Sequence, residues 1–294
     1  MESAIETFSI FGGLGWQIDI DESLDSLITK NILENYAHLY NEIEYLISED
    51  KKYHKLLHAL AVSDRRLPSA FKRAHINNTL GGMAIGYLQD AGVLEIENSR
   101  EEPILKEYPK QKQKREIIHH RISPKMRFTM PFIRFWFYFI YPHRREIQEG
   151  NYTLVLEDIE KNLTSYTSLV FEELSNIFLV HKYLQKDPIT DYGSYWDRMV
   201  EIDILAHTAN NQTLVGECKW TNHKIIKKEL TKLEDKCLKV EIEPSVIILF
   251  SKRGFSNELL SHKSEVLQLY DVEDFHLLLD NLSQDDLIHG FATP

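Results

Sequence analysis

The sequence of 294 residues predicts a two-domain α/β protein, with a mainly helical half at residues 1–150 and a mixed sheet in residues 151–294. Three observations support this prediction. Apolar residues in the first half recur at helical spacing, and the second half alternates strand-like with helix-like segments. In addition, 43% of the residues are hydrophobic and 11% are aromatic, which is enough to build packed cores.

The first half contains a run of helical segments that ends in a ribbon. Leucine and isoleucine recur at helical spacing over residues 22–49. Three shorter helices are expected at residues 53–62, 65–74 and 77–92, followed by strands at residues 93–97 and 115–123 on either side of the loop PKQKQKR. Three helices followed by a two-stranded ribbon is the order of a winged helix.

An aromatic segment, residues 128–141, closes the first half. Its apolar run contains Pro131 and Arg134 and is shorter than the about 20 residues that a membrane-spanning helix needs. We therefore expect a buried aromatic helix.

The second half begins with an amphipathic helix at residues 164–184, followed by the turn-rich stretch DPITDYGSYWD. Strands are expected at residues 199–207 and 213–220, joined by the polar turn TANNQ, and then a helix at 223–240 and strands at 245–251 and 266–271. This alternation of strands and helices predicts a mixed α/β layer.

The formal net charge of −11 hides an uneven distribution. Residues 1–50 carry −10, residues 51–150 carry +9, and residues 151–294 carry −10. The total argues against a generic nucleic-acid binder, but the basic middle block is suited to a phosphate backbone. The candidate DNA-binding residues are Lys110, Lys112, Lys114 and Arg115 in the wing loop and Arg65, Arg66, Lys72 and Arg73 on the preceding helices.

Two features of this half leave the nature of its partner open. The third helix offers no arginine for bidentate contact with guanine, so recognition of DNA backbone or structure is expected rather than sequence readout. Its glycines, Gly81, Gly82 and Gly86, also permit close helix packing, which favours a protein-interaction module to a similar degree. A lysine-rich loop is in addition often merely a solvated segment.

The hairpin EIDILAHTANNQTLVGECKW carries the candidate chemistry. Period two places Glu201 and Asp203 on one strand face, and Glu217 and Lys219 on one face of the next strand, so Asp203 and Glu217 can lie opposite each other. Two carboxylates and a lysine on an apolar hairpin are costly to bury unless they are paired or bind a metal. Mg²⁺ favours such a carboxylate pair with water. A cross-strand salt-bridge ladder on a solvated face is the alternative, and spacing alone favours it.

The pattern D-x(13)-E-x-K, preceded by a helix with a glutamate, resembles the PD-(D/E)XK nuclease superfamily. The segments FSIFGGLGWQI, MPFIRFWFYFIYPHRREIQEGN, VFEELS, YWDRMVEIDILA, GECKW and LFSKRGFS together resemble, in this order, the C-terminal half of archaeal-type AAA+ ATPases. That half is similar to a winged helix followed by a nuclease-like domain of unknown function, and the resemblance covers nearly the whole chain.

This resemblance implies a restriction-endonuclease-like fold at residues 151–294 and a Mg²⁺- or Mn²⁺-dependent deoxyribonuclease. Asp203 and Glu217 would hold the metal, Lys219 would be the catalytic lysine, and Glu172 would assist through metal or water. Helical phase leaves open whether Glu172 or its neighbour Glu173 faces the hairpin. The acidic second half favours the alternative, a non-catalytic DNA-binding or protein-interaction protein that keeps the fold.

Several other activities are not supported by the sequence. No glycine is followed by lysine, so the chain has no G-x-x-x-x-G-K-[ST] phosphate loop, and an ATPase would have to be a separate partner. The histidine pair His54 and His58 lacks the glutamate of an HExxH motif and is expected to be structural. Two cysteines and an acidic start without an apolar leader predict a cytoplasmic protein that does not insert into membranes.

Overall fold

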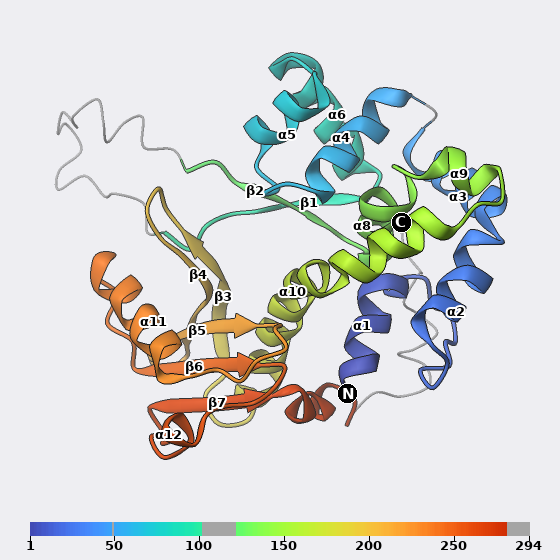
Figure 1. The fold of residues 1–294 in the computed structure, drawn as a ribbon. Coiled ribbons are helices and arrows are strands. Elements are labelled where there is room, and N and C mark those ends of the chain that lie inside the picture. The colour runs from blue at the N-terminus through green and yellow to red at the C-terminus, as the bar shows by residue number, and fades with distance from the viewer. Residues whose placement is uncertain (49, 102–121, 281–294) are drawn as a thin grey trace, which may run out of the picture. The chain divides into compact units, whose positions relative to one another are not determined.

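The computed structural model describes residues 1–48, 50–101 and 122–280. Within them the chain divides into two compact units, shown in Figure 1. The described parts of residues 1–97 and 124–170 form the first unit, and those of 98–123 and 171–280 form the second. The division falls inside the long helix α10 (Thr153–Tyr183), and the predicted boundary at residue 150 lies just before this helix.

The first unit is mainly helical, as predicted. Its helices are α1 (Glu2–Phe11), α2 (Leu24–Ile28), the π-helical turn η1 (Thr29–Leu33), α3 (Tyr36–Ile47), α4 (Lys51–Ala61), α5 (Leu67–Ala74), α6 (Asn78–Asp90), α8 (Pro131–Phe135), the π-helical turn η2 (Trp136–Ile140) and α9 (Arg144–Gln148). Side-chain caps begin three of them: Ser23, Asp50 and Asn77 accept backbone N–H groups of α2, α4 and α6.

A two-stranded antiparallel ribbon follows α4, α5 and α6. Strand β1 (Leu94–Glu97) pairs with β2 (Lys125–Phe128), with Leu94 opposite Phe128. The predicted partner at residues 115–123 is therefore not the strand that pairs with β1, and its residues 115–121 lie outside the described part of the chain. The segment Lys125–Phe128 takes this place because it buries Met126 and Phe128 in the helical core.

The aromatic segment lies at the centre of this core and confirms the predicted buried helix. Trp136 is 1% exposed and stacks on Tyr36 of α3, with ring centroids 5.4 Å apart. Arg134, the charged residue of this segment, is also buried. Its guanidinium donates a hydrogen bond to the Tyr166 carbonyl at 3.0 Å and lies over the Tyr166 ring, so the charge has a defined partner.

The second unit is built on a five-stranded mixed sheet in the order β3-β4-β5-β6-β7. Its strands are β3 (Ile189–Trp196), β4 (Glu201–Thr208), β5 (Thr213–Lys219), β6 (Val246–Ser251) and β7 (Leu267–Asp271), with α11 (Lys227–Lys239) between β5 and β6 and α12 (Asn257–Leu260) and the 3₁₀ turn η3 (Val272–Leu278) near β7. Strands β3, β4 and β5 are antiparallel, and β5, β6 and β7 are parallel. This confirms the predicted mixed α/β layer.

Strand β3 occupies the stretch that the sequence pattern indicates as turn-rich. Two register irregularities interrupt its pairing with β4, and Gly193 has a φ of 153°. These breaks remove the regular alternation by which a strand is recognised in a sequence. With β3 included, the second unit runs in the order α10-β3-β4-β5-α11-β6.

The sheet is covered on both faces. On one face, Val215, Leu249 and Leu269 belong to an apolar cluster with Leu233 and Cys237 of α11. On the other face, the second part of α10 packs aromatic rings against the sheet, including Phe171 against Trp220 of the segment after β5 and Phe178 against Phe250 and Tyr270. A charged side chain on either face must therefore be paired or lie near an open edge.

Candidate functional site

The β4–β5 hairpin brings the predicted acidic pair together. Ile204 pairs with Gly216 across the hairpin, so Asp203 and Glu217 are the next residues along the two strands. Gly216 fits because a Cβ at this position would lie 3.1 Å from the Ile204 Cβ and 3.3 Å from the Ile248 carbonyl oxygen. The neighbouring strands therefore approach closely just beside the acidic pair.

Glu217 is held by two lysines on the α11 face of the sheet. Its side chain is almost fully buried, and Lys219 Nζ donates to Oε1 at 2.5 Å while Lys236 Nζ of α11 donates to Oε2 at 2.6 Å. Lys219 belongs to the predicted site, whereas Lys236 was not predicted. The carboxylate charge is thus neutralised from both sides.

Asp203 is fixed by the backbone of the adjacent strand, because its Oδ2 accepts the Cys218 N–H at 2.8 Å. Burial, together with the negative charge of Glu217, raises the pKa of Asp203 from 3.8 to about 6. Burial lowers the pKa of the Lys219 ammonium, but the charge and hydrogen bond of Glu217 outweigh this effect and leave that pKa above its ordinary value. At neutral pH, Asp203 is therefore mainly ionised and Lys219 protonated.

Glu172 lies on α10, the helix that covers the opposite face of the sheet from α11. Its charge acts on Cys218, whose thiol pKa is raised well above its ordinary value by burial and by the negative charges of Asp203 and Glu172. Cys218 is therefore a buried, protonated thiol rather than a nucleophile. The structure brings Asp203, Glu217 and Lys219 together and associates Glu172 with the Cys218 side of the same strand.

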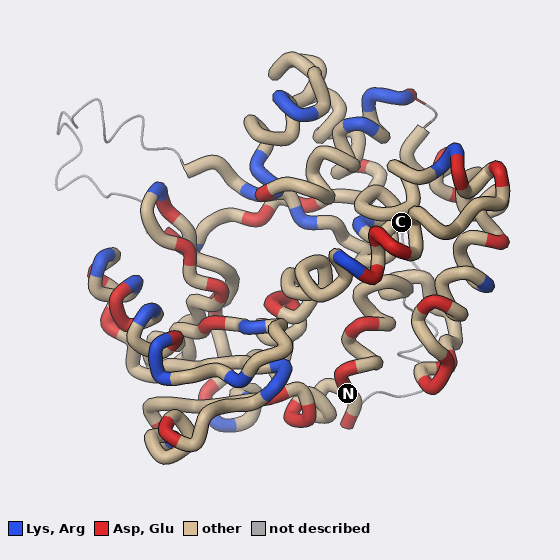
Figure 2. The backbone as a smooth tube through the Cα atoms, in the orientation of Figure 1, with Lys and Arg blue, Asp and Glu red and all other residues tan. Residues whose placement is uncertain are grey.

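The basic residues that follow β5 and β6, which could form a basic rim around this site, differ in exposure. Lys224, Lys227 and Lys228 at the start of α11 are exposed, and Figure 2 shows further basic positions along this helix. Lys252 is only 5% exposed, and its ammonium lies 4.8 Å from the centre of the Trp220 ring. Lys252 therefore packs inside the unit and is not part of an exposed rim.

The basic residues of the first unit also separate into groups. Lys110, Lys112, Lys114 and Arg115 lie outside the described residues. Arg65 is 8% exposed and forms an ion pair with Glu97 at 3.0 Å, so it stabilises the start of α5 against β1 and is poorly placed to meet phosphate. Arg66 lies 3.7 Å from Asp64, while Lys72 and Arg73 are exposed in the last turn of α5.

Within the described part of the chain, three or more His, Cys, Asp or Glu side chains do not gather anywhere in a metal-binding group. Asp203 and Glu217 provide two carboxylates, and a complete coordination shell would need water or substrate oxygens. In addition, no helix of the described residues is both long enough and apolar enough to cross a membrane.

Part of the chain, including the hairpin, is similar to a family without an assigned function. Residues 136–233 match DUF234, the family described as "Archaea bacterial proteins of unknown function". The match runs from η2 into α11 and includes Glu172, Asp203, Glu217 and Lys219, but it ends before Lys236.

An uncharacterized protein of Methanocaldococcus jannaschii is 26% identical over 235 residues, which cover 76% of this chain and 49% of the relative. The chain thus spans about half the length of this curated relative. No solved structure matches the chain.

Proposed function

We propose that the protein is a Mg²⁺- or Mn²⁺-dependent phosphodiesterase of the PD-(D/E)XK type that acts on DNA. One observation carries this proposal: the element order α10-β3-β4-β5-α11-β6 places Asp203, Glu217 and Lys219 on one face of the central hairpin. These are the elements and the residues that the motif requires. The spacing alone favours a salt-bridge ladder on a solvated face, but Glu217 is only 8% exposed and so does not lie on a solvated face.

The residues present fit a divalent cation. Two largely buried carboxylates lie close enough for Glu217 to raise the pKa of Asp203, and a cation between them would relieve this repulsion. Oxygen ligands of this kind suit Mg²⁺ and Mn²⁺. When bound, the ion would supply Lewis-acid chemistry, lowering the pKa of water and offsetting charge on the phosphate.

The side chains have separate tasks in this proposal. Asp203 and Glu217 would hold the cation, and the Cys218 N–H would keep the Asp203 carboxylate in a fixed orientation. Lys219 stays protonated because its pKa is raised, so it cannot act as a general base. It would instead orient the attacking water and stabilise the charge that develops on the phosphate oxygens.

DNA recognition is assigned to the first unit, as a winged helix that contacts the phosphate backbone. The exposed pair Lys72 and Arg73 at the end of α5 supports this assignment, and the lysine-rich loop of residues 109–115 would add further charge. Since Arg65 forms an ion pair with Glu97, fewer helix residues are available to contact DNA than the sequence predicts.

A second candidate function has its own observation. Lys219 and Lys236 each occupy one oxygen of Glu217, so the carboxylate is satisfied without a metal ion. This arrangement favours a non-catalytic DNA-binding or protein-interaction protein that keeps the nuclease-like fold and works with a separate ATPase. The two candidates differ in whether a metal ion displaces the Lys236 ammonium from Glu217.

Cleavage assays test the first candidate directly. The full chain is incubated with duplex, single-stranded and branched DNA in Mg²⁺ or Mn²⁺, beside Asp203→Asn, Lys219→Ala and the control Lys232→Ala, which removes an exposed lysine from α11. We expect cleavage by the wild type and the control, and a loss of at least about 100-fold in the two site variants. Cleavage that persists in both site variants, or is absent from the wild type on every substrate, would refute the enzymatic function and leave the second candidate.

A further inference from the structure

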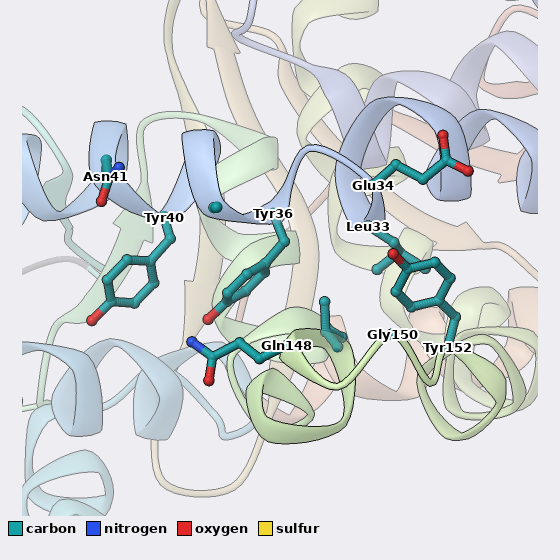
Figure 3. Close-up of a pocket in the computed structure, with 10 residues that line it drawn as sticks. Leu33, Glu34, Tyr36, Tyr40, Asn41, Gln148, Gly150 and Tyr152 are labelled. Atoms are coloured by element: carbon teal, nitrogen blue, oxygen red, sulfur yellow. The ribbon is translucent and has the colours of Figure 1, made fainter.

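A pair of adjoining cavities follows helix α3 in the first unit. The smaller one has a volume of about 380 Å³ and is drawn in Figure 3, with Tyr36, Tyr40 and Gln148 around it. The larger one has a volume of about 710 Å³. Tyr40 and Asn41 line both cavities, so the two lie side by side. The size of the larger cavity is that of a site for a small organic molecule.

Three cationic side chains line the larger cavity. These are Lys51 and Lys55 of α4 and Arg144 of α9. Among the described residues none of the three forms an ion pair, whereas Lys52, which does not line the cavity, pairs with Asp50 at 2.7 Å. Arg144 is held in place, because it donates to the Tyr141 carbonyl at 2.9 Å and its guanidinium lies over the Tyr141 ring. The cavity therefore offers positive charge to an anionic group.

The carboxylate of Glu44 also lines this cavity, but it already has a partner. Glu44 Oε1 is buried and lies 2.9 Å from His54 Nε2, so a ligand in the cavity does not reach this oxygen. His54 is almost fully buried, with its ring against those of Phe137 and Tyr141. The three cations therefore outnumber the one carboxylate of the lining.

Aromatic rings complete the lining of the larger cavity. Tyr40, Tyr45 and Tyr141 all contribute, and Tyr45 is 92% exposed at the surface, which is unusual for a large aromatic side chain. Tyrosine rings of this kind give a planar ligand a stacking surface at little cost in side-chain entropy. The cavity thus combines three cations with aromatic rings.

We propose that this cavity binds a nucleoside monophosphate. The phosphate would meet Lys51, Lys55 and Arg144, and the base would stack on the tyrosines. This site is independent of the proposed nuclease function, since all of its residues belong to the first unit and none belongs to the acidic hairpin. It needs no phosphate loop, because side chains rather than a glycine-rich turn supply the charge.

Calorimetry of the full chain with AMP tests the proposal. The titration is carried out in EDTA, which removes divalent cations and so excludes metal-dependent binding of AMP at the hairpin. Adenosine and inorganic phosphate serve as the two halves of the ligand. We expect one AMP site per chain, with an affinity at least about 10-fold above that of either half, because the halves are joined in one molecule. No saturable AMP binding, or equal affinity for AMP and phosphate, would overturn the proposal.

Variants test which residues bind. The double variant Lys51→Ala, Lys55→Ala should bind AMP about 10-fold more weakly, whereas Lys52→Ala should change the affinity by less than about 2-fold. All three lysines lie on the surface of α4, and thermal unfolding checks that each variant folds. Equal losses in the double variant and in Lys52→Ala would reduce the effect to general charge and contradict the site.

Discussion

Replacing Asp203 by asparagine should stabilise the protein at alkaline pH in the absence of metal. Asparagine has nearly the same shape as aspartate, and its Oδ1 can still accept the Cys218 N–H that Asp203 Oδ2 accepts at 2.8 Å. The variant therefore removes a buried charge and keeps its hydrogen bond. A purely structural aspartate would behave in the opposite way, because its loss would destabilise the fold.

The size of the effect follows from the pKa of Asp203. Folding raises this pKa from 3.8 to about 6, so the native state binds the proton more tightly than the unfolded chain. The resulting stability is fully present below about pH 3.8 and is lost as the pH rises through 6. From the difference of about 2 pKa units, the charge on Asp203 destabilises the native state, relative to a neutral side chain, by about 3 kcal/mol at pH 8 and by only about 0.5 kcal/mol at pH 4.

Urea unfolding in EDTA at pH 4 and pH 8 measures this difference. The gain in the free energy of unfolding of Asp203→Asn over the wild type should grow from about 0.5 to about 3 kcal/mol between these pH values. Glu201→Gln, which removes an exposed carboxylate from the same strand, is the matched control and should show no such growth. A pH-independent difference, or a less stable Asp203→Asn at pH 8, would refute the reasoning.

Three further predictions concern packing and charge. Lys236→Ala should lower the free energy of unfolding by about 1–2 kcal/mol in urea titrations, because a nearly buried carboxylate loses one of its two lysine partners; an unchanged stability would contradict this pairing. Gly216→Ala should cost about 1–3 kcal/mol, since its Cβ would crowd Ile204 and the Ile248 carbonyl oxygen, whereas Gly82→Ala on the exposed side of α6 should gain about 0.5–1 kcal/mol; equal effects would be inconsistent with the packing. Charge reversal of Lys72 and Arg73 should weaken DNA binding and reduce its salt dependence without changing thermal unfolding, and an unaltered salt slope would exclude them from the contact surface.

The acidic hairpin could be predicted from the sequence because its geometry is local. Two strands joined by a short polar turn must pair, and period two then decides that Asp203 and Glu217 share a face. The same rule places Cys218 on the opposite face, where the structure buries its thiol. Each of these conclusions needs only neighbouring residues and the geometry of a strand.

Lys236 could not be predicted in the same way, because its contact with Glu217 depends on how α11 packs on the sheet. A weak signal existed: Leu230, Leu233 and Cys237 form the buried stripe of α11, and Lys236 borders it. The position of Glu172 is another result of packing. Helical phase shows that one glutamate of α10 can face the sheet, but only the packing contacts of the two helices show that α10 and α11 lie on opposite faces.

The ribbon of the first unit shows a different limit. Alternation alone allows both residues 115–123 and Lys125–Phe128 as the partner of β1, since both contain apolar residues at suitable spacing. What decides is the burial of Met126 and Phe128 against helices far away in the sequence. Arg65 illustrates the same point, because its ion pair with Glu97 joins two segments that only the packing of the unit brings together.

A Mn²⁺ titration of the full chain by calorimetry tests whether Asp203 and Glu217 together hold a divalent metal ion. We expect one site per chain in the wild type, loss of binding in Asp203→Asn and Glu217→Gln, and tighter binding in Lys236→Ala, where a competing ammonium is removed from Glu217. Absence of Mn²⁺ binding from both the wild type and Lys236→Ala, or binding that is unchanged in the two carboxylate variants, would contradict the proposed metal site.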